Sequence, residues 1–150
     1  MMLIVDVLSQ VLRKHVRRFR EHQDLLEIEC QMSIEVVTTV FPKFIRFDLS
    51  GEYSLEDLFD FINNAKVLAG DANRDHLFID TIQLNGRMSE ADRFMAGRHI
   101  ADVFGPQLKA ACFMRAELIT KLGELTAVNR GARFYVTETE EDALKWLLAS

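Results

Sequence analysis

The last twenty residues of the chain constrain its fold more than any other stretch. Residues 133–136 have the pattern of a short buried strand, and the Thr137-Glu-Thr139 segment that follows offers threonine hydroxyls as helix caps. The closing helix is predicted from apolar residues at helical spacing, Ala143, Leu144, Trp146 and Leu147. A strand that passes directly into a helix is the repeating unit of α/β proteins.

The same unit recurs along the preceding chain. Ser54 and Ser89 each stand before a helical pattern and have an aspartate three residues later, which is typical of a capped helix start. Gly131 stands where a helix end favours a left-handed residue. The predicted strands cover residues 33–41, 43–50, 76–80, 108–114 and 133–136, and the predicted helices cover about 54–69, 89–105, 116–130 and the closing segment. This order predicts an α/β fold with a mixed, mostly parallel β-sheet and helices packed on it.

Composition and motifs argue against several classes of function. The net charge of −5 argues against general binding of nucleic acid. The sequence contains no run of about 18 apolar residues, so no transmembrane segment is predicted. Cys30 and Cys112 are far apart in sequence and are predicted to be reduced thiols, which favours a cytoplasmic location. The histidines are scattered, and no nucleophile–base or phosphate-loop motif occurs. We therefore expect no metal, no cofactor and no catalysis.

Residues 1–31 are predicted to be an N-terminal extension, with the α/β domain covering residues 32–150. Residues 1–20 combine apolar residues at helical spacing with Arg13, Lys14, Arg17, Arg18 and Arg20, which predicts a basic amphipathic helix. Such a helix can make peripheral contact with an anionic membrane, dock on a partner or pack on its own domain. The extension is either accessory or lies upstream of a natural start at Met32, and residues 26–30 could add a strand.

The helix predicted from Ser54 has an apolar stripe wider than one sheet face usually demands. Its members recur over four turns and are Leu55, Leu58, Phe59, Phe61, Ile62, Ala65 and Leu68. A second contact would explain the width, so we expect a homodimer or partner surface on this helix, with Phe61 as part of it.

Residues 34–149 resemble a STAS domain, and in particular its small SpoIIAA-like branch. The matching segments are Phe47-Asp-Leu-Ser-Gly-Glu-Tyr-Ser-Leu-Glu-Asp-Leu58, Leu77-Phe-Ile-Asp80, Leu125-Thr-Ala-Val-Asn-Arg-Gly131 and the closing Glu-Glu-Asp-Ala-Leu-Lys-Trp-Leu. They are caps and core positions, not a catalytic motif. The resemblance implies a non-enzymatic regulatory module that binds a protein partner, such as a regulator or an anti-sigma-like protein.

In STAS proteins that switch partners, a kinase phosphorylates a serine at the start of the helix after the central strand, and the complex with the anti-sigma factor then breaks. The resemblance places this position at Ser89 or Glu90, although Met88-Ser-Glu-Ala91 replaces the family's Asp-Ser-Ser-Gly. Arg87 and Arg93 would favour an added phosphate, while Glu90 would oppose it. The loop and helix around Ser89 are thus the predicted partner surface, with plain capping as the other role of Ser89.

Further residues are candidates for ligand binding. Asp80, which we also group with Ser89 as a candidate for the partner surface, ends the predicted central strand, where α/β sheets place ligand groups, or else it caps a backbone donor. Asn129 and Arg130 could hold an anion beside Asp80, unless Arg130 only offsets the helix dipole. SpoIIAA-like proteins also resemble SEC14-like domains, which implies an alternative function as carrier or sensor of a small apolar, lipid-like ligand. The phenylalanines with Met88, Met95 and Met114 would line its pocket, or they fill an ordinary core.

Overall fold

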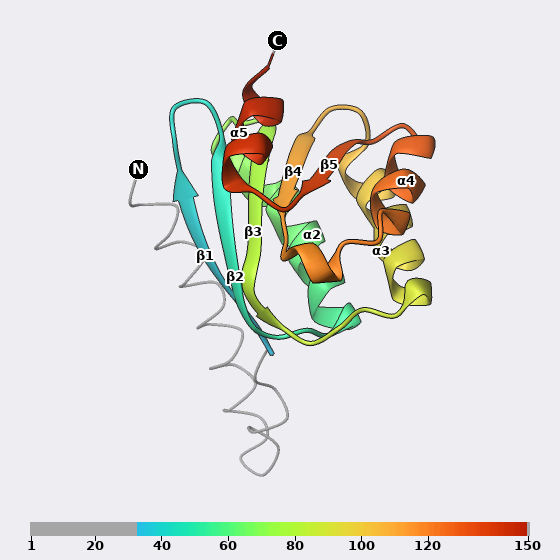
Figure 1. The fold of residues 1–150 in the computed structure, drawn as a ribbon. Coiled ribbons are helices and arrows are strands. Elements are labelled where there is room, and N and C mark those ends of the chain that lie inside the picture. Colours follow the sequence, from blue (N-terminus) through green and yellow to red (C-terminus); the bar gives the residue numbers. More distant parts are fainter. Residues whose placement is uncertain (1–32, 150) are drawn as a thin grey trace, which may run out of the picture.

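A computed structural model describes residues 33–149 of the chain (Figure 1). The predicted extension over residues 1–31, including its amphipathic helix, its membrane or partner contact, the strand over residues 26–30 and Cys30, lies outside the described residues. Within them, five strands form one sheet: β1 (Ile34–Val40), β2 (Ile45–Glu52), β3 (His76–Asn85), β4 (Lys109–Phe113) and β5 (Arg133–Thr137). The helices are α2 (Leu55–Asp71), α3 (Glu90–Phe104), α4 (Leu122–Asn129) and α5 (Glu140–Leu148), with a short 3₁₀ turn at Ala116–Leu118.

The strands lie in the sheet in the order in which they occur in the chain, β1-β2-β3-β4-β5. β1 pairs with β2 in antiparallel register, and each later pair is parallel, so the predicted mixed, mostly parallel α/β sheet is confirmed. Each crossover from β2 onward moves one strand further in the same direction. Because right-handed crossovers that all advance in one direction put their helices on one face, α2, α3 and α4 form a single layer, and α5 returns to the other face (Figure 1).

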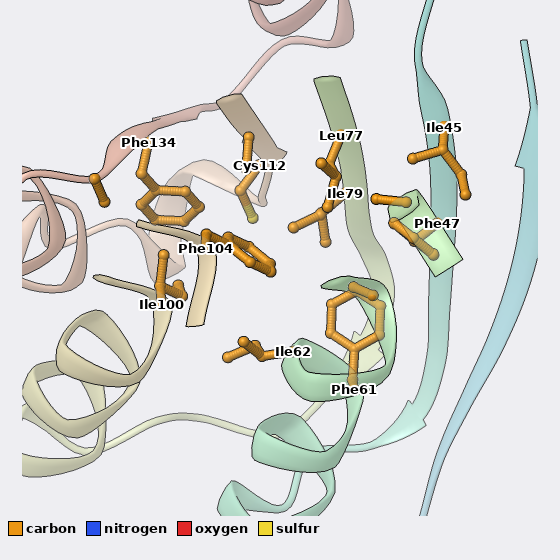
Figure 2. Packing of buried hydrophobic residues seen from close by; sticks show 14 of the residues in the cluster. Ile45, Phe47, Phe61, Ile62, Leu77, Ile79, Ile100, Phe104, Cys112 and Phe134 are labelled. Atoms are coloured by element: carbon orange, nitrogen blue, oxygen red, sulfur yellow. The ribbon is translucent and has the colours of Figure 1, made fainter. Parts of the chain in front are cut away.

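The main core lies between the sheet and the layer of α2, α3 and α4. Alternate residues of β2, β3, β4 and β5 point toward these helices, among them Phe47, Ile79, Cys112 and Phe134 (Figure 2). A smaller cluster on the opposite face joins the sheet to α5 through Phe78, Ala111, Ala143 and Leu147. The central strands of a parallel sheet that is covered on both faces are apolar throughout. This pattern in residues 77–79 predicted the central strand, which the structure shows as β3.

α5 is capped at its start and joined to the sheet at its end. Thr139 caps its start by accepting from the Asp142 backbone N–H at 3.1 Å, as predicted for this segment. At the other end the buried Lys109 of β4 donates its ammonium group to the carbonyls of Trp146, at 2.7 Å, and Ala149, at 3.1 Å. Desolvation, assisted by the charge of Arg133, lowers the pKa of Lys109. The ammonium group therefore satisfies free carbonyls where the helix dipole is negative.

β3 is longer than the predicted strand and runs on to Asn85, so Asp80 lies in the middle of the strand and not at its end. Between Asp80 and Gln83 the register with β2 shifts, because two residues of β3 stand opposite one residue of β2. Asp80 Oδ1 accepts from the backbone N–H of Ile82 at 2.9 Å, next to the shift. The capping role predicted for Asp80 is thus confirmed. Contrary to the sequence prediction, Asp80 does not end β3, but it is the last residue of β3 that pairs with β4.

The helix predicted over residues 116–130 is wrong in its first half. A 3₁₀ turn at Ala116–Leu118 is followed by extended residues, and α4 begins only at Leu122, after Lys121 in the left-handed conformation with φ of 68°. Two contacts with β5 hold this start: Glu124 accepts from the Val136 backbone N–H at 2.6 Å, and Lys121 donates to the Val136 carbonyl. Tertiary contacts therefore override the helical pattern here. The predicted left-handed Gly131 at the end of α4 is confirmed by its φ of 95°.

The wide apolar stripe of α2 is explained by contacts within the chain. Phe61 faces the sheet, is only 6% exposed and meets Phe47 edge to face, with ring centroids 5.3 Å apart (Figure 2). Phe59 instead stacks on His99 of α3 at 4.4 Å, and the His99 ring also bonds to Asn63 of α2. The stripe is wide because α2 packs on both the sheet and α3. The placement of Phe61 on a dimer surface is wrong, and a homodimer stays a prediction without an assigned surface.

Candidate functional site

The start of α3 is the first candidate site. Ser89 is exposed, and its hydroxyl accepts from the backbone N–H of Asp92 at 3.1 Å, so the predicted cap is present. The Asp92 carboxylate accepts a hydrogen bond from the Tyr53 hydroxyl at 2.9 Å, and burial together with this carboxylate raises the pKa of Tyr53. The first turn of α3 is therefore tied to the segment that connects β2 with α2.

The charged residues around Ser89 differ in their exposure. Arg87 and Glu90 are exposed, whereas Arg93 is only 9% exposed. Arg93 Nε lies 3.3 Å from Glu90 Oε1 but makes no hydrogen bond with any described residue. The Arg93 backbone N–H donates to the Ser89 carbonyl at 3.0 Å. The structure thus brings together four of the predicted residues at the start of α3. Arg87, Ser89 and Glu90 are exposed to solvent, and Arg93 is buried.

Asp80 belongs to a different face of the molecule. Its carboxylate accepts from Arg46 at 2.8 Å, and Arg46 also contacts Asp48 at 3.1 Å and Glu140 at the start of α5. The Arg46 guanidinium lies 4.7 Å from the centre of the Phe78 ring, in the cluster beneath α5. Because the sheet separates this cluster from α3, the grouping of Asp80 with Ser89 is wrong. Asp80 and Glu140 together connect β2, β3 and α5 through one guanidinium.

Asn129 and Arg130 also lie away from Asp80. They are at the end of α4, in the layer on the other side of the sheet. The Arg130 guanidinium lies 5.3 Å from the centre of the exposed Phe94 ring of α3, and Arg98 lies 5.9 Å from the same ring. The prediction of an anion site beside Asp80 is therefore wrong, since Arg130 stacks on an aromatic ring between α3 and α4.

The second candidate site is a cavity of about 120 Å³ between the helix layer and the sheet. We call it the interlayer cavity. Its walls come from all the strands except β1, from α2, α3 and α4, and from the segments before α3 and α4. Met88 and Met114 line it, as the ligand hypothesis predicted, whereas Met95 does not and is 44% exposed. The walls are mainly apolar, and include Ile62, Ile79, Ile100, Phe104 and Phe134.

Three charged residues line the interlayer cavity: Arg93, Lys121 and Glu124. Lys121 Nζ and Glu124 Oε2 form an ion pair at 2.9 Å, and both also bond to the backbone of Val136. Lys121 and Glu124 were missed in the sequence, where the pattern over residues 116–130 indicated one continuous helix. Their spacing of three residues and the adjacent Gly123, an unusual residue inside a helix, were the available signals.

Cys112 also lines the interlayer cavity. Burial raises the pKa of its thiol to about 12. The thiol is therefore protonated at neutral pH and is a poor nucleophile, because the reactive form is the thiolate. Within residues 33–149, no three histidine, cysteine or acidic side chains gather in an arrangement that could hold a metal ion. None of the helices in the described part of the chain is long and apolar enough to cross a membrane.

No family model matches the chain, and no curated protein matches its sequence. Among solved structures, an anti-sigma factor antagonist from Mycobacterium paratuberculosis is similar with a TM-score of 0.54 and 17% identity, covering 80% of this chain and 98% of that one. A protein with a SpoIIAA-like fold from Shewanella loihica gives a TM-score of 0.48 and 19% identity over 77% and 93% of the two chains. An antisigma-factor antagonist STAS domain from Rhodobacter sphaeroides gives 0.28 and 10% over 77% and 96%.

The first of these likenesses is close enough to show the fold. The chain therefore shares the fold of this anti-sigma factor antagonist, which is the kind of fold that its sequence resemblance implied. It combines this fold with an exposed serine cap at the start of α3 and a mainly apolar cavity beneath the same helix.

Proposed function

We propose that the protein is a non-enzymatic regulatory module that binds a protein partner through the loop and helix around Ser89. The observation that carries this proposal is the exposed start of α3, where Arg87, Ser89 and Glu90 face solvent beside the fully formed first turn. A docking site on a preformed helix end loses little conformational freedom on binding. The similar structure of an anti-sigma factor antagonist supports a partner of the anti-sigma type.

Ser89 acts in this proposal as a cap, and not as a phosphorylation switch. Ser89→Ala should lower the free energy of unfolding by about 1 kcal/mol, while Ser89→Asp should change it little, because aspartate caps equally well. A partner recovered from the native host by wild type should also be recovered by Ser89→Asp. In that complex, hydrogen exchange should show protection of the amides of residues 87–94.

The matched control is Thr139→Asp, which changes the corresponding cap of α5 on the opposite face of the sheet. Loss of the partner by Ser89→Asp alone, with an unchanged melting temperature, would establish a switch at Ser89. Protection confined to α5 would overturn the partner surface at α3.

A second candidate function is that of a carrier or sensor of a small apolar ligand, and the interlayer cavity is the observation that favours it. An engineered cavity of about 150 Å³ with apolar walls binds benzene. The cavity of about 120 Å³ in this chain is of similar size, and it is lined by two methionines whose methyl groups report on their surroundings.

Benzene should therefore bind, and it should shift the methyl NMR signals of Met88 and Met114 while it leaves Met95 unchanged. Binding to the folded state alone should also raise the melting temperature with benzene concentration. Met95 is the control because it lies on α3 but outside the cavity. Equal shifts at all three methionines, or none at saturating benzene, would exclude a ligand site in the interlayer cavity.

A further inference from the structure

Arg93 is a buried cation without a complete set of partners. Only 9% of the residue is exposed, and its Nε is buried and makes no hydrogen bond within residues 33–149. Its nearest acidic group, Glu90 Oε1, lies at 3.3 Å on a side chain that is 63% exposed. A charge removed from water is costly unless it is both paired and hydrogen-bonded. The Glu90 contact leaves this requirement only partly met.

The other two charges on the cavity wall do not need a ligand. Lys121 and Glu124 neutralise each other at 2.9 Å, and the backbone of Val136 supplies each with a further hydrogen bond. Two cations, Arg93 and Lys121, line the interlayer cavity. Arg93 is the one whose Nε has no hydrogen-bond partner among the described residues. The remaining walls are mainly apolar, so the complementary molecule has one anionic group and an apolar body.

We propose that the interlayer cavity binds a small amphipathic acid, with its carboxylate on the Arg93 guanidinium and its apolar body against Met88 and Met114. A planar guanidinium offers two parallel N–H donors that match the two oxygens of a carboxylate. The cavity volume limits the apolar body to about the size of a benzene ring. This proposal rests on the second candidate function and adds the charge, size and anchoring residue of the ligand.

Benzoate tests the proposal because it joins a ring of the right size to a carboxylate, and benzyl alcohol is its neutral counterpart. In calorimetric titrations of the full chain, benzoate should bind at least about tenfold more tightly than benzyl alcohol, which corresponds to one hydrogen bond to a charged group. Arg93→Met should remove this preference by weakening benzoate binding alone. Arg98→Met, an exposed change on the same helix outside the cavity, should leave both affinities unchanged.

Glu90→Gln provides a test that does not depend on the folding of Arg93→Met. This exposed change removes the carboxylate that competes for Arg93, so benzoate should bind more tightly while benzyl alcohol is unaffected. Equal binding of benzoate and benzyl alcohol by wild type would overturn the acidic ligand and leave the cavity as a site for neutral apolar molecules. Failure of benzoate, benzyl alcohol and benzene alike would overturn the proposal together with the second candidate function.

Discussion

Phe61→Asp should abolish cooperative unfolding, with circular dichroism during urea titration showing no folded baseline. Phe61 is 6% exposed and contacts Phe47, which is fully buried. Truncation of a buried phenylalanine alone costs about 3–5 kcal/mol, and an unpaired carboxylate in the same place adds a further desolvation penalty. The sum is comparable with the whole stability of a domain, which is typically about 5–15 kcal/mol.

Val67→Asp is the matched control, because it puts the same charge on the same helix at a residue that is 60% exposed. Its effect should stay within about 0.5 kcal/mol. Phe61→Ala, which adds no charge, should remain folded with a lower transition midpoint. A folded, monomeric Phe61→Asp with a normal transition would show that Phe61 lies at a surface, and would restore α2 as a dimer surface.

Gly97→Ala should lower the free energy of unfolding by about 1–3 kcal/mol, the usual range for an overpacked interior position. A Cβ atom at this position of α3 would lie 2.5 Å from the Gly123 carbonyl oxygen and 2.8 Å from Thr126 Cβ. The carbonyl belongs to the backbone of α4 and cannot rotate away, so the two helices must separate. The higher helix propensity of alanine offsets at most about 1 kcal/mol of this cost.

Gly70→Ala gives the opposite sign and serves as the control. Nothing lies within 4 Å of the Cβ position at Gly70, near the end of α2. Alanine should therefore stabilise the protein there by about 0.5–1 kcal/mol, through helix propensity alone. Chemical denaturation measures both variants, and a stabilising Gly97→Ala would contradict the close contact of α3 with α4.

The residues that the sequence placed correctly are those whose roles depend on near neighbours in the chain. Ser89 and Thr139 cap the helices they precede, and Ser54 accepts from the Asp57 N–H at 3.3 Å. The reciprocal half of the capping pattern at Ser54 does not form. Asp57 instead accepts from the backbone and hydroxyl of Ser33, which immediately precedes β1. A long-range contact thus decided where this carboxylate points, which the local pattern could not indicate.

The candidate site was predicted less well than the fold. Ser89 and its charged neighbours are predictable because a helix start has a local signature, and Met88 and Met114, which the sequence offers as pocket residues, do line the interlayer cavity. The sequence predicts Arg93 as a partner for a phosphate on Ser89, whereas Arg93 is only 9% exposed and lines the interlayer cavity. Its backbone lies close to α4, where a Cβ at Gly123 would be 3.3 Å from the Arg93 carbonyl oxygen.

The sequence by itself determined the element order, the mixed, mostly parallel sheet and the helix caps, because hydrophobic periodicity and capping act over a few residues. The tertiary structure alone decided which side chains share a face. It placed the Asp80 carboxylate with Arg46 beside the cluster under α5 and not in the helix layer that contains Ser89, broke the helix predicted over residues 116–130 at Lys121, and directed Phe59 onto α3. Each outcome depends on contacts between segments far apart in the chain, whose energies exceed the local preferences that a sequence pattern records.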